Sequence, residues 1–228
     1  MYDIAIFGAT FAGAGILKAY KGKCVVIEKN TLCGYEFINA LKKGVNTEEK
    51  PVTEEGKAFY KEIRNKSVLE FSMPLHRIFE NKNIKLATMV SDIEKTEEGF
   101  LIRLFNNGGF EEIRAKKIVD TICHSDMIIS KTLNALVQTD KELEESGING
   151  RKIFKCQLDS ADDFITARLK LKKELEKGMM ADYIASEFDV CTEENILKKG
   201  EITYLTSVSY KNPYLAFDAG CKLAKEGF

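Results

Sequence analysis

Histidine is scarce in this chain, and its cysteines are scattered. The 228 residues include only two histidines, and no C-x-x-C pair occurs. The six cysteines are Cys24, Cys33, Cys123, Cys156, Cys191 and Cys221. This pattern argues against a zinc site and against a disulfide framework, and it favours the reduced thiols of a cytoplasmic protein. We therefore expect no bound metal and a cytoplasmic location.

The chain also lacks an excess of charge and a long apolar run. Its 34 Lys and Arg against 35 Asp and Glu give a net charge of −1, so no electrostatic footprint for nucleic acid exists. No apolar run approaches the ~20 residues that span a bilayer, and a strand-like segment begins at residue 2, so we expect neither a membrane partner nor a signal peptide. With 44% hydrophobic and 30% charged residues, the composition is that of a globular protein with one large or two small domains.

The most informative segment is residues 3–28, DIAIFGATFAGAGILKAYKGKCVVIE. It reads as an apolar strand, a glycine-containing turn, a short helix and a second apolar strand, which is the start of a dinucleotide-binding βαβ unit. Gly8 allows a sharp turn, Gly13 allows close packing, and the helix N-terminus offers N–H groups to a pyrophosphate. Glu28, twenty residues after Gly8, is placed to accept hydrogen bonds from a ribose.

Thr10 departs from the G-x-G-x-x-G pattern, because the middle glycine is missing. This leaves open a βαβ unit that keeps its glycines for packing only. It also leaves open a dehydrogenase that uses NAD, although the antiparallel segment described next argues against a simple NAD domain.

The remaining chain alternates between strand and helix patterns. Residues 84–120 show alternation and a hairpin signal at Asn106–Gly109, which predicts an antiparallel meander that returns to the main sheet. Further along we predict a helix within 126–147, a strand at 151–158, helices at 162–177 and 179–188, a strand at 202–207 and a helix at 213–226. The fold class is therefore α/β.

The first turn, Gly8-Ala-Thr-Phe-Ala-Gly13, resembles that of the FAD-dependent oxidoreductases with a glutathione-reductase-like two-domain FAD fold, in the group that reads G-[GA]-T-x-A-G. Residues 84–122 resemble the family's meander and following strand, and residues 204–219 its last strand and helix. The resemblance implies a Rossmann-like three-layer FAD-binding domain made of residues 1–124 and 201–228. A small inserted α+β cap of residues 125–200 would hold the substrate.

The same resemblance implies which residues hold FAD. The expected cofactor-binding residues are Gly8, Thr10, Phe11, Ala12, Gly13, Glu28, Lys29, Cys33, Asn212 and Pro213. Two family features are missing: Cys123 replaces the glycine of A-T-G, and Thr206 or Ser207 stands where a Gly-Asp aspartate is usual.

Catalytic residues are not evident from the sequence, because flavin chemistry requires few protein groups. His124 is a weak candidate as a proton donor, since it follows a strand end where such sheets bind ligands. Cys33 is a weak candidate for a redox thiol beside the flavin, although a packing role is the simpler interpretation.

Two functions remain open at this stage. The first is an FAD-binding oxidoreductase that transfers hydride between flavin and a small substrate or second electron carrier, as a monomer or a homo-oligomer. The second is a degenerate or compact FAD-fold protein that acts as a non-catalytic subunit or a regulatory dinucleotide-binding module. The missing A-T-G glycine and Gly-Asp aspartate favour the second of these functions.

Overall fold

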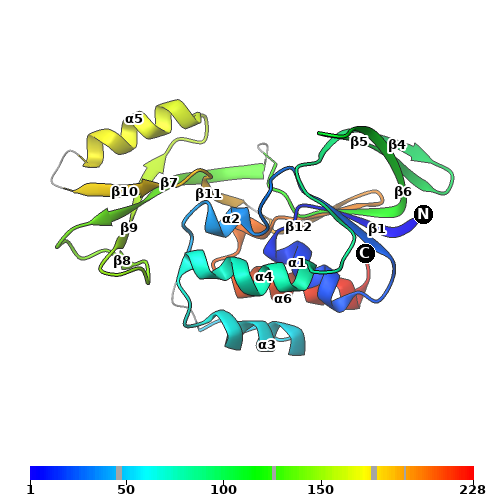
Figure 1. Cartoon of the computed structure of the whole chain (residues 1–228), viewed down its shortest axis with the longest axis horizontal. Helices are drawn as coiled ribbons and strands as arrows, with labels where there is room; N and C mark the ends of the chain where they lie inside the picture. Colours follow the sequence, from blue (N-terminus) through cyan, green and yellow to red (C-terminus); the bar gives the residue numbers. More distant parts are fainter. Residues whose placement is uncertain (45–47, 125–126, 176–178, 193) are drawn as a thin grey trace.

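The computed structural model of the chain describes residues 1–44, 48–124, 127–175, 179–192 and 194–228. Two sheets organise it: a large sheet packed against several helices, and a smaller sheet at the opposite end that carries helix α5 (Figure 1). Both chain termini lie at the end formed by the large sheet. Within the described ranges, no helix is long and apolar enough to cross a bilayer.

The large sheet has the strand order β12-β13-β6-β1-β2-β3, with β5 paired to β6 and β4 paired to β5. Its strands are β1 (Tyr2–Phe7), β2 (Cys24–Ile27), β3 (Ile84–Lys85), β4 (Met89–Thr96), β5 (Gly99–Asn106), β6 (Gly109–Asp120), β12 (Ile196–Lys199) and β13 (Ile202–Leu205). Strand β1 pairs in parallel with β2 and β6, β13 pairs in parallel with β6, and β4, β5 and the first half of β6 form the antiparallel meander. This confirms the Rossmann-like α/β fold expected from the sequence.

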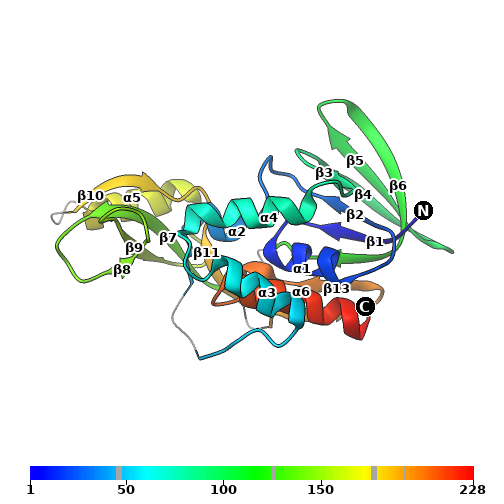
Figure 2. The same cartoon turned by 60° about the horizontal axis from the view of Figure 1, so that its bottom comes forward.

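Strand β1 lies at the centre and is buried on both faces, as its unbroken apolar run requires. Ile4 and Ile6 join the core shared with the helices, whereas Ala5 and Phe7 join a second core with the meander. Figure 2 shows the meander on the side opposite to α3 and α6. The sheet is thus the middle of three layers.

The helices of this domain are α1 (Phe11–Ala19), α2 (Tyr35–Ile38), α3 (Glu54–Ile63), α4 (Ser72–Phe79) and α6 (Pro213–Glu226), with 3₁₀ turns at Val68–Phe71 and Ser207–Ser209. The two helices at the ends of the chain, α1 and α6, pack directly on each other. Two glycines permit this contact. A Cβ on Gly15 would lie 2.0 Å from the carbonyl oxygen of Phe217, and one on Gly220 would lie 2.0 Å from that of Ala12.

This contact leads to a stability prediction. Gly15→Ala should lower the free energy of unfolding by roughly 1–3 kcal/mol, because the added methyl group meets backbone that cannot rotate away. Gly108→Ala, in the exposed turn between β5 and β6, is the matched control, since its nearest neighbour is a movable side-chain oxygen at 3.1 Å. Urea unfolding of both variants measures the difference, and equal stabilities would contradict the close approach.

The small sheet has the order β10-β7-β9-β8, with β11 also paired to β7. Its elements are β7 (Ile128–Gln138), β8 (Glu144–Glu145), β9 (Lys152–Leu158), β10 (Met180–Ile184) and β11 (Asp189–Thr192), with α5 (Phe164–Leu175) packed on β9 and β7. The helices predicted within 126–147 and at 179–188 are therefore wrong over their described residues. Strand β12 lies inside the span expected for the cap, yet it pairs with β13 in the large sheet.

The two sheets are joined at the segment that follows α2. The Lys42 ammonium lies 2.7 Å from the Asp189 carboxylate and donates to the carbonyl oxygen of Val208 at 2.6 Å. The Asn134 amide donates to the carbonyl oxygen of Ala40 at 2.7 Å. These contacts place the small sheet beside the carboxyl ends of the parallel strands, where such folds bind their ligands.

Candidate functional site

The turn after β1 is closed by a chain of hydrogen bonds that starts at α1. The Gly13 N–H donates to the Thr10 hydroxyl at 3.0 Å, and this hydroxyl donates to that of Thr121 at 2.7 Å. Thr121 donates in turn to the carbonyl oxygen of Phe7 at 2.7 Å. Thr10 is thus the N-cap of α1 and ties the turn to the end of β6.

The cap can be tested by substitution. Thr10→Val keeps the shape of the side chain but removes the acceptor for Gly13, so it should cost about 1–2 kcal/mol of unfolding free energy. Thr10→Ser keeps the hydroxyl and should lose much less. If thermal unfolding ranks the two variants equally, the hydroxyl is not what holds the turn.

The first N–H groups of α1 also have protein acceptors. The Phe11 N–H donates to Oε1 of Glu36 at 2.7 Å. The Ala12 N–H donates to the Ser207 hydroxyl at 3.1 Å, and this hydroxyl donates to the same Glu36 oxygen at 2.8 Å. A carboxylate therefore lies where the positive end of the α1 dipole would attract an anion.

Glu36 is almost fully buried, and this sets its acidity. Burial raises the pKa of its carboxyl group to about 7, although the hydrogen bonds from Phe11 and Ser207 oppose the shift. Its second oxygen, Oε2, has no hydrogen-bond partner among the described residues. The group can therefore change its charge near neutral pH.

Glu28 is buried as well, at the end of β2. Its Oε2 accepts from the Ala9 N–H at 2.8 Å, and its Oε1 accepts from the Asn30 N–H at 2.7 Å. Burial raises the pKa of the Glu28 carboxyl group, although these two hydrogen bonds oppose the shift. In this conformation Glu28 ties the turn to the following loop, and its proposed contact with a ribose stays a prediction.

The space beside this turn is small. A cavity of about 130 Å³ borders Lys29, Glu36, Thr121 and Val208. Pockets for drug-sized ligands usually measure roughly 300–1,000 Å³, and FAD is larger than most such ligands. The cavity is therefore smaller than a usual ligand pocket, and Glu36 forms part of its wall.

The residues present therefore do not fit FAD in this conformation. A diphosphate bound at the turn would need the N–H groups of Phe11 and Ala12, which already have acceptors. It would also meet the Glu36 carboxylate, and two anions in a buried site repel each other. Binding would require Glu36 to move or to be protonated.

The end of β6 holds the weak catalytic candidate His124. Its Nε2 lies 2.8 Å from the Asp120 carboxylate, and its ring meets that of Tyr204 edge-on at 5.3 Å. Cys123 borders the small cavity, where the family pattern has a glycine. The structure places His124 at a strand end as expected, with its ring held by Asp120.

The remaining expected residues lie at several places around the turn. Lys29 lies 5.7 Å from the Tyr35 ring centre and borders the small cavity. Cys33 is buried, which raises the pKa of its thiol to about 12 and disfavours a thiolate. Asn212 and Pro213 begin α6, but the Asn212 side chain does not cap this helix.

Sequence reasoning missed Glu36 and assigned Ser207 no contact. The available signal was the position of Glu36, two residues after Gly34 in the segment that follows Glu28. A carboxylate at that point faces the same helix terminus that a diphosphate would use. Ser207 reaches this terminus from the opposite end of the chain, so only the folded structure reveals their contact.

No family model and no curated protein sequence matches this chain. Solved structures do resemble it. The p-nitrophenol 4-monooxygenase PnpA of Pseudomonas putida DLL-E4 superposes with a TM-score of 0.63 at 12% identity, over 99% of this chain and 77% of that one. A geranylgeranyl bacteriochlorophyll reductase-like protein of Thermoplasma acidophilum gives 0.58 at 12%, over 98% and 77%.

Aklavinone-11 hydroxylase, solved with FAD and aklavinone, superposes with a TM-score of 0.56 at 12% identity, over 99% of this chain. The chain spans only 62% of that hydroxylase, and a similar share of several other matching structures. Identities this low establish shape and not activity. The chain shares the Rossmann-like α/β fold of these structures.

Proposed function

We propose that this chain is a non-catalytic protein of the FAD-binding fold whose dinucleotide site is closed by its own side chains. The observation that carries the proposal is the Glu36 carboxylate, which accepts from the Phe11 N–H at 2.7 Å at the start of α1. The protein would act as a subunit or a regulatory module, because its turn already holds an anion in the place of a diphosphate.

The surrounding contacts support this closure. Ser207 bridges the Ala12 N–H and Glu36, and Thr10 takes the Gly13 N–H, so the α1 terminus is satisfied internally. Helix termini that bind anions keep such N–H groups available. Glu28 satisfies Ala9 in the same way on the other side of the turn.

A second candidate is an FAD-dependent oxidoreductase that transfers hydride between flavin and a small substrate. It is favoured by the fold shared with aklavinone-11 hydroxylase and by Glu28 at the end of β2. FAD would supply the redox chemistry, and this chain would have to withdraw Glu36 before its turn could hold the diphosphate.

The visible spectrum of the purified protein separates the two candidates. We expect no flavin absorbance, no cofactor released on denaturation, and no rise in the melting temperature when FAD is added in excess. A stoichiometric flavin that dithionite bleaches and air restores would refute the non-catalytic proposal and establish the second candidate.

A further inference from the structure

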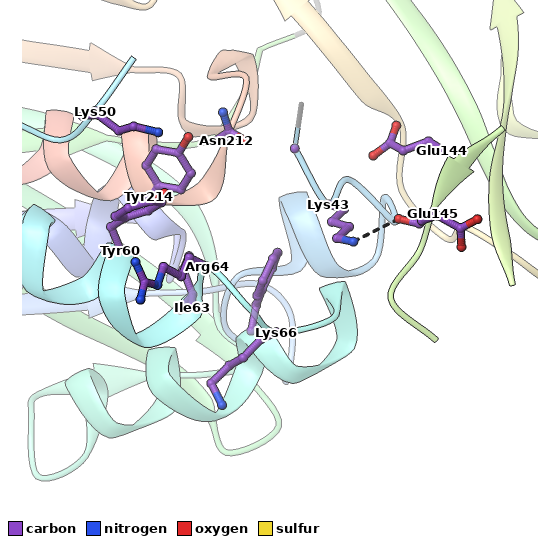
Figure 3. Close-up of a pocket in the computed structure, with 12 residues that line it drawn as sticks. Lys43, Lys50, Tyr60, Ile63, Arg64, Lys66, Glu144, Glu145, Asn212 and Tyr214 are labelled. Atoms are coloured by element: carbon purple, nitrogen blue, oxygen red, sulfur yellow. Dashed lines mark hydrogen bonds between the residues drawn. The ribbon is translucent and has the colours of Figure 1, made fainter. Parts of the chain in front are cut away.

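The largest cavity among the described residues brings no set of ligand groups together. It measures about 390 Å³ and opens between α3, the start of α6 and strand β8 (Figure 3). The basic side chains of Lys43, Arg64 and Lys66 border it but point away from one another. The cavity therefore indicates no small-molecule site.

Helix α5 leaves two large apolar side chains in solvent. Figure 1 shows this helix along the outer side of the small sheet, at the end of the molecule opposite to both termini. It packs inward through Ala167 and Leu171, which are fully buried, whereas Ile165 is 73% exposed and Leu169 is 58% exposed. Residues four apart lie on the same side of a helix, so Ile165 and Leu169 form one apolar ridge.

Three basic side chains flank this ridge. Arg168 follows Ile165 by three residues, and Lys172 and Lys173 follow Leu169 by three and four, so all three lie beside the ridge. Each of them is exposed. These five side chains, here called the α5 outer face, combine two aliphatic groups with three positive charges.

The acidic residue of α5 lies on another side of the helix. Glu174 is the only acid among the described residues of α5. Burial raises the pKa of the Cys156 thiol in β9, and the nearby Glu174 carboxylate raises it further. Since α5 packs on β9, this proximity places Glu174 on the flank that faces the sheet. It therefore does not neutralise the α5 outer face.

The acids of the loop before α5 are engaged at the start of the helix. The Asp159 and Asp162 carboxylates both lie 2.6 Å from the Lys170 ammonium. The Asp163 carboxylate accepts from the Thr166 N–H at 2.7 Å. These contacts hold the three carboxylates at the N-terminal end of α5, away from Lys172 and Lys173 one to two turns further along.

The meander, at the opposite end of the molecule, carries a cluster of the reverse charge. The Arg103 guanidinium lies between the carboxylates of Asp92, Glu94 and Glu112, at 2.5, 2.9 and 3.1 Å. Three carboxylates against one guanidinium leave negative charge in this cluster. An anionic surface would therefore attract the α5 outer face and repel the Arg103 cluster.

We propose that the α5 outer face binds the surface of an anionic lipid bilayer. Ile165 and Leu169 enter the layer below the headgroups, and Arg168, Lys172 and Lys173 contact lipid phosphates. Long basic side chains can place their charges at the headgroup level while their hydrocarbon stems cover apolar groups. Apolar and basic side chains on one helix are typical of helices that lie in the plane of a membrane interface.

A bilayer suits this face better than an acidic protein does. A lipid surface offers phosphates and, slightly deeper, hydrocarbon, which match the two chemistries of the face in order of depth. A ridge on one helix can enter this soft layer without a preformed groove in a partner. The contact is peripheral and does not depend on the closure of the α1 turn. It revises the expectation of no membrane partner, which rested on the lack of a spanning run.

Vesicle sedimentation tests the proposal. The wild-type protein should sediment with vesicles of equal parts phosphatidylcholine and phosphatidylglycerol, and not with vesicles of phosphatidylcholine alone. Ile165→Ser/Leu169→Ser should weaken this binding at least about tenfold, because it removes the groups that insert. Arg168→Gln/Lys172→Gln/Lys173→Gln should also weaken it at least about tenfold, because it removes the attraction to phosphate. Urea unfolding of each variant checks that the fold is retained.

An exposed aromatic pair on the meander supplies the matched control. Phe105 and Phe110 are 46% and 81% exposed, with ring centres 5.1 Å apart. Phe105 lies two residues after Arg103 on β5, so it shares a strand face with the acidic cluster. Phe105→Ser/Phe110→Ser should therefore bind the mixed vesicles as the wild type does.

Fluorescence locates the contact directly. The chain contains no tryptophan, so a single introduced one reports only its own surroundings. The emission of Leu169→Trp should shift to shorter wavelengths when the mixed vesicles are added, because the indole enters a less polar layer. The emission of Phe110→Trp should not shift.

Four results would overturn the proposal. The first is no sedimentation of the wild type with the mixed vesicles. The second is equal binding of the wild type and Ile165→Ser/Leu169→Ser. The third is a shift of Phe110→Trp as large as that of Leu169→Trp, which would indicate a contact without a preferred face. The fourth is binding to poly-glutamate without binding to vesicles, which would assign the α5 outer face to an acidic protein.

Discussion

Glu36→Ala should raise the affinity of the protein for FAD and for ADP roughly 10- to 100-fold above that of the wild type. The substitution removes a buried negative charge and releases the Phe11 N–H, so a diphosphate regains a charge-assisted hydrogen bond of about 1.5–3 kcal/mol. Fluorescence titration with FAD and calorimetry with ADP measure the change.

Ser207→Ala is the matched control for that gain. It releases the Ala12 N–H but leaves the Glu36 carboxylate in place. We therefore expect a much smaller increase in affinity than for Glu36→Ala. If neither variant binds either nucleotide better than the wild type, the carboxylate is not what closes the turn.

The protein should lose stability as the pH rises toward 8, because Glu36 is buried. Because burial raises the pKa of Glu36 from 4.5 to about 7, the folded state holds its proton more tightly than the unfolded state does. The resulting stabilisation is complete below pH 4.5 and is lost as the pH rises through 7. The loss should reach at most about 3 kcal/mol by pH 8.

Glu36→Gln isolates this contribution. The amide oxygen can still accept from Phe11, but the group no longer titrates. Glu28 and Glu187 also have pKa values raised by burial, so they add a slope of the same sign in both proteins. Urea unfolding at pH 5 and pH 8 should show a larger loss for the wild type than for the variant, and parallel losses would contradict the raised pKa.

The sequence predicted the large sheet better than the small one. The run Tyr2–Phe7, the glycines that follow and the hairpin signal at Asn106–Gly109 each depend on local chemistry, so the βαβ unit and the meander were predicted correctly. Strand β7 was mistaken for a helix. Its pairing with β9, β10 and β11 is made by residues distant in sequence, and such pairing overrides local preference.

In the candidate site, too, the local features could be predicted from the sequence, whereas the contacts between distant segments could not. Thr10 could be noticed as a departure from the glycine pattern, but its bond to Thr121 joins residues 111 positions apart. Glu36 and Ser207 are separated by 171 residues, and their contact exists only after the last strand is in place. The sequence could therefore locate the turn but not show that its N–H groups are already satisfied.

A crystal structure grown with a large excess of FAD tests the central claim most directly. We predict that Oε1 of Glu36 will lie within hydrogen-bond distance of the Phe11 N–H, with no diphosphate at the start of α1. A structure in which the FAD diphosphate accepts from Phe11 and Ala12, with Glu36 displaced, would contradict the claim.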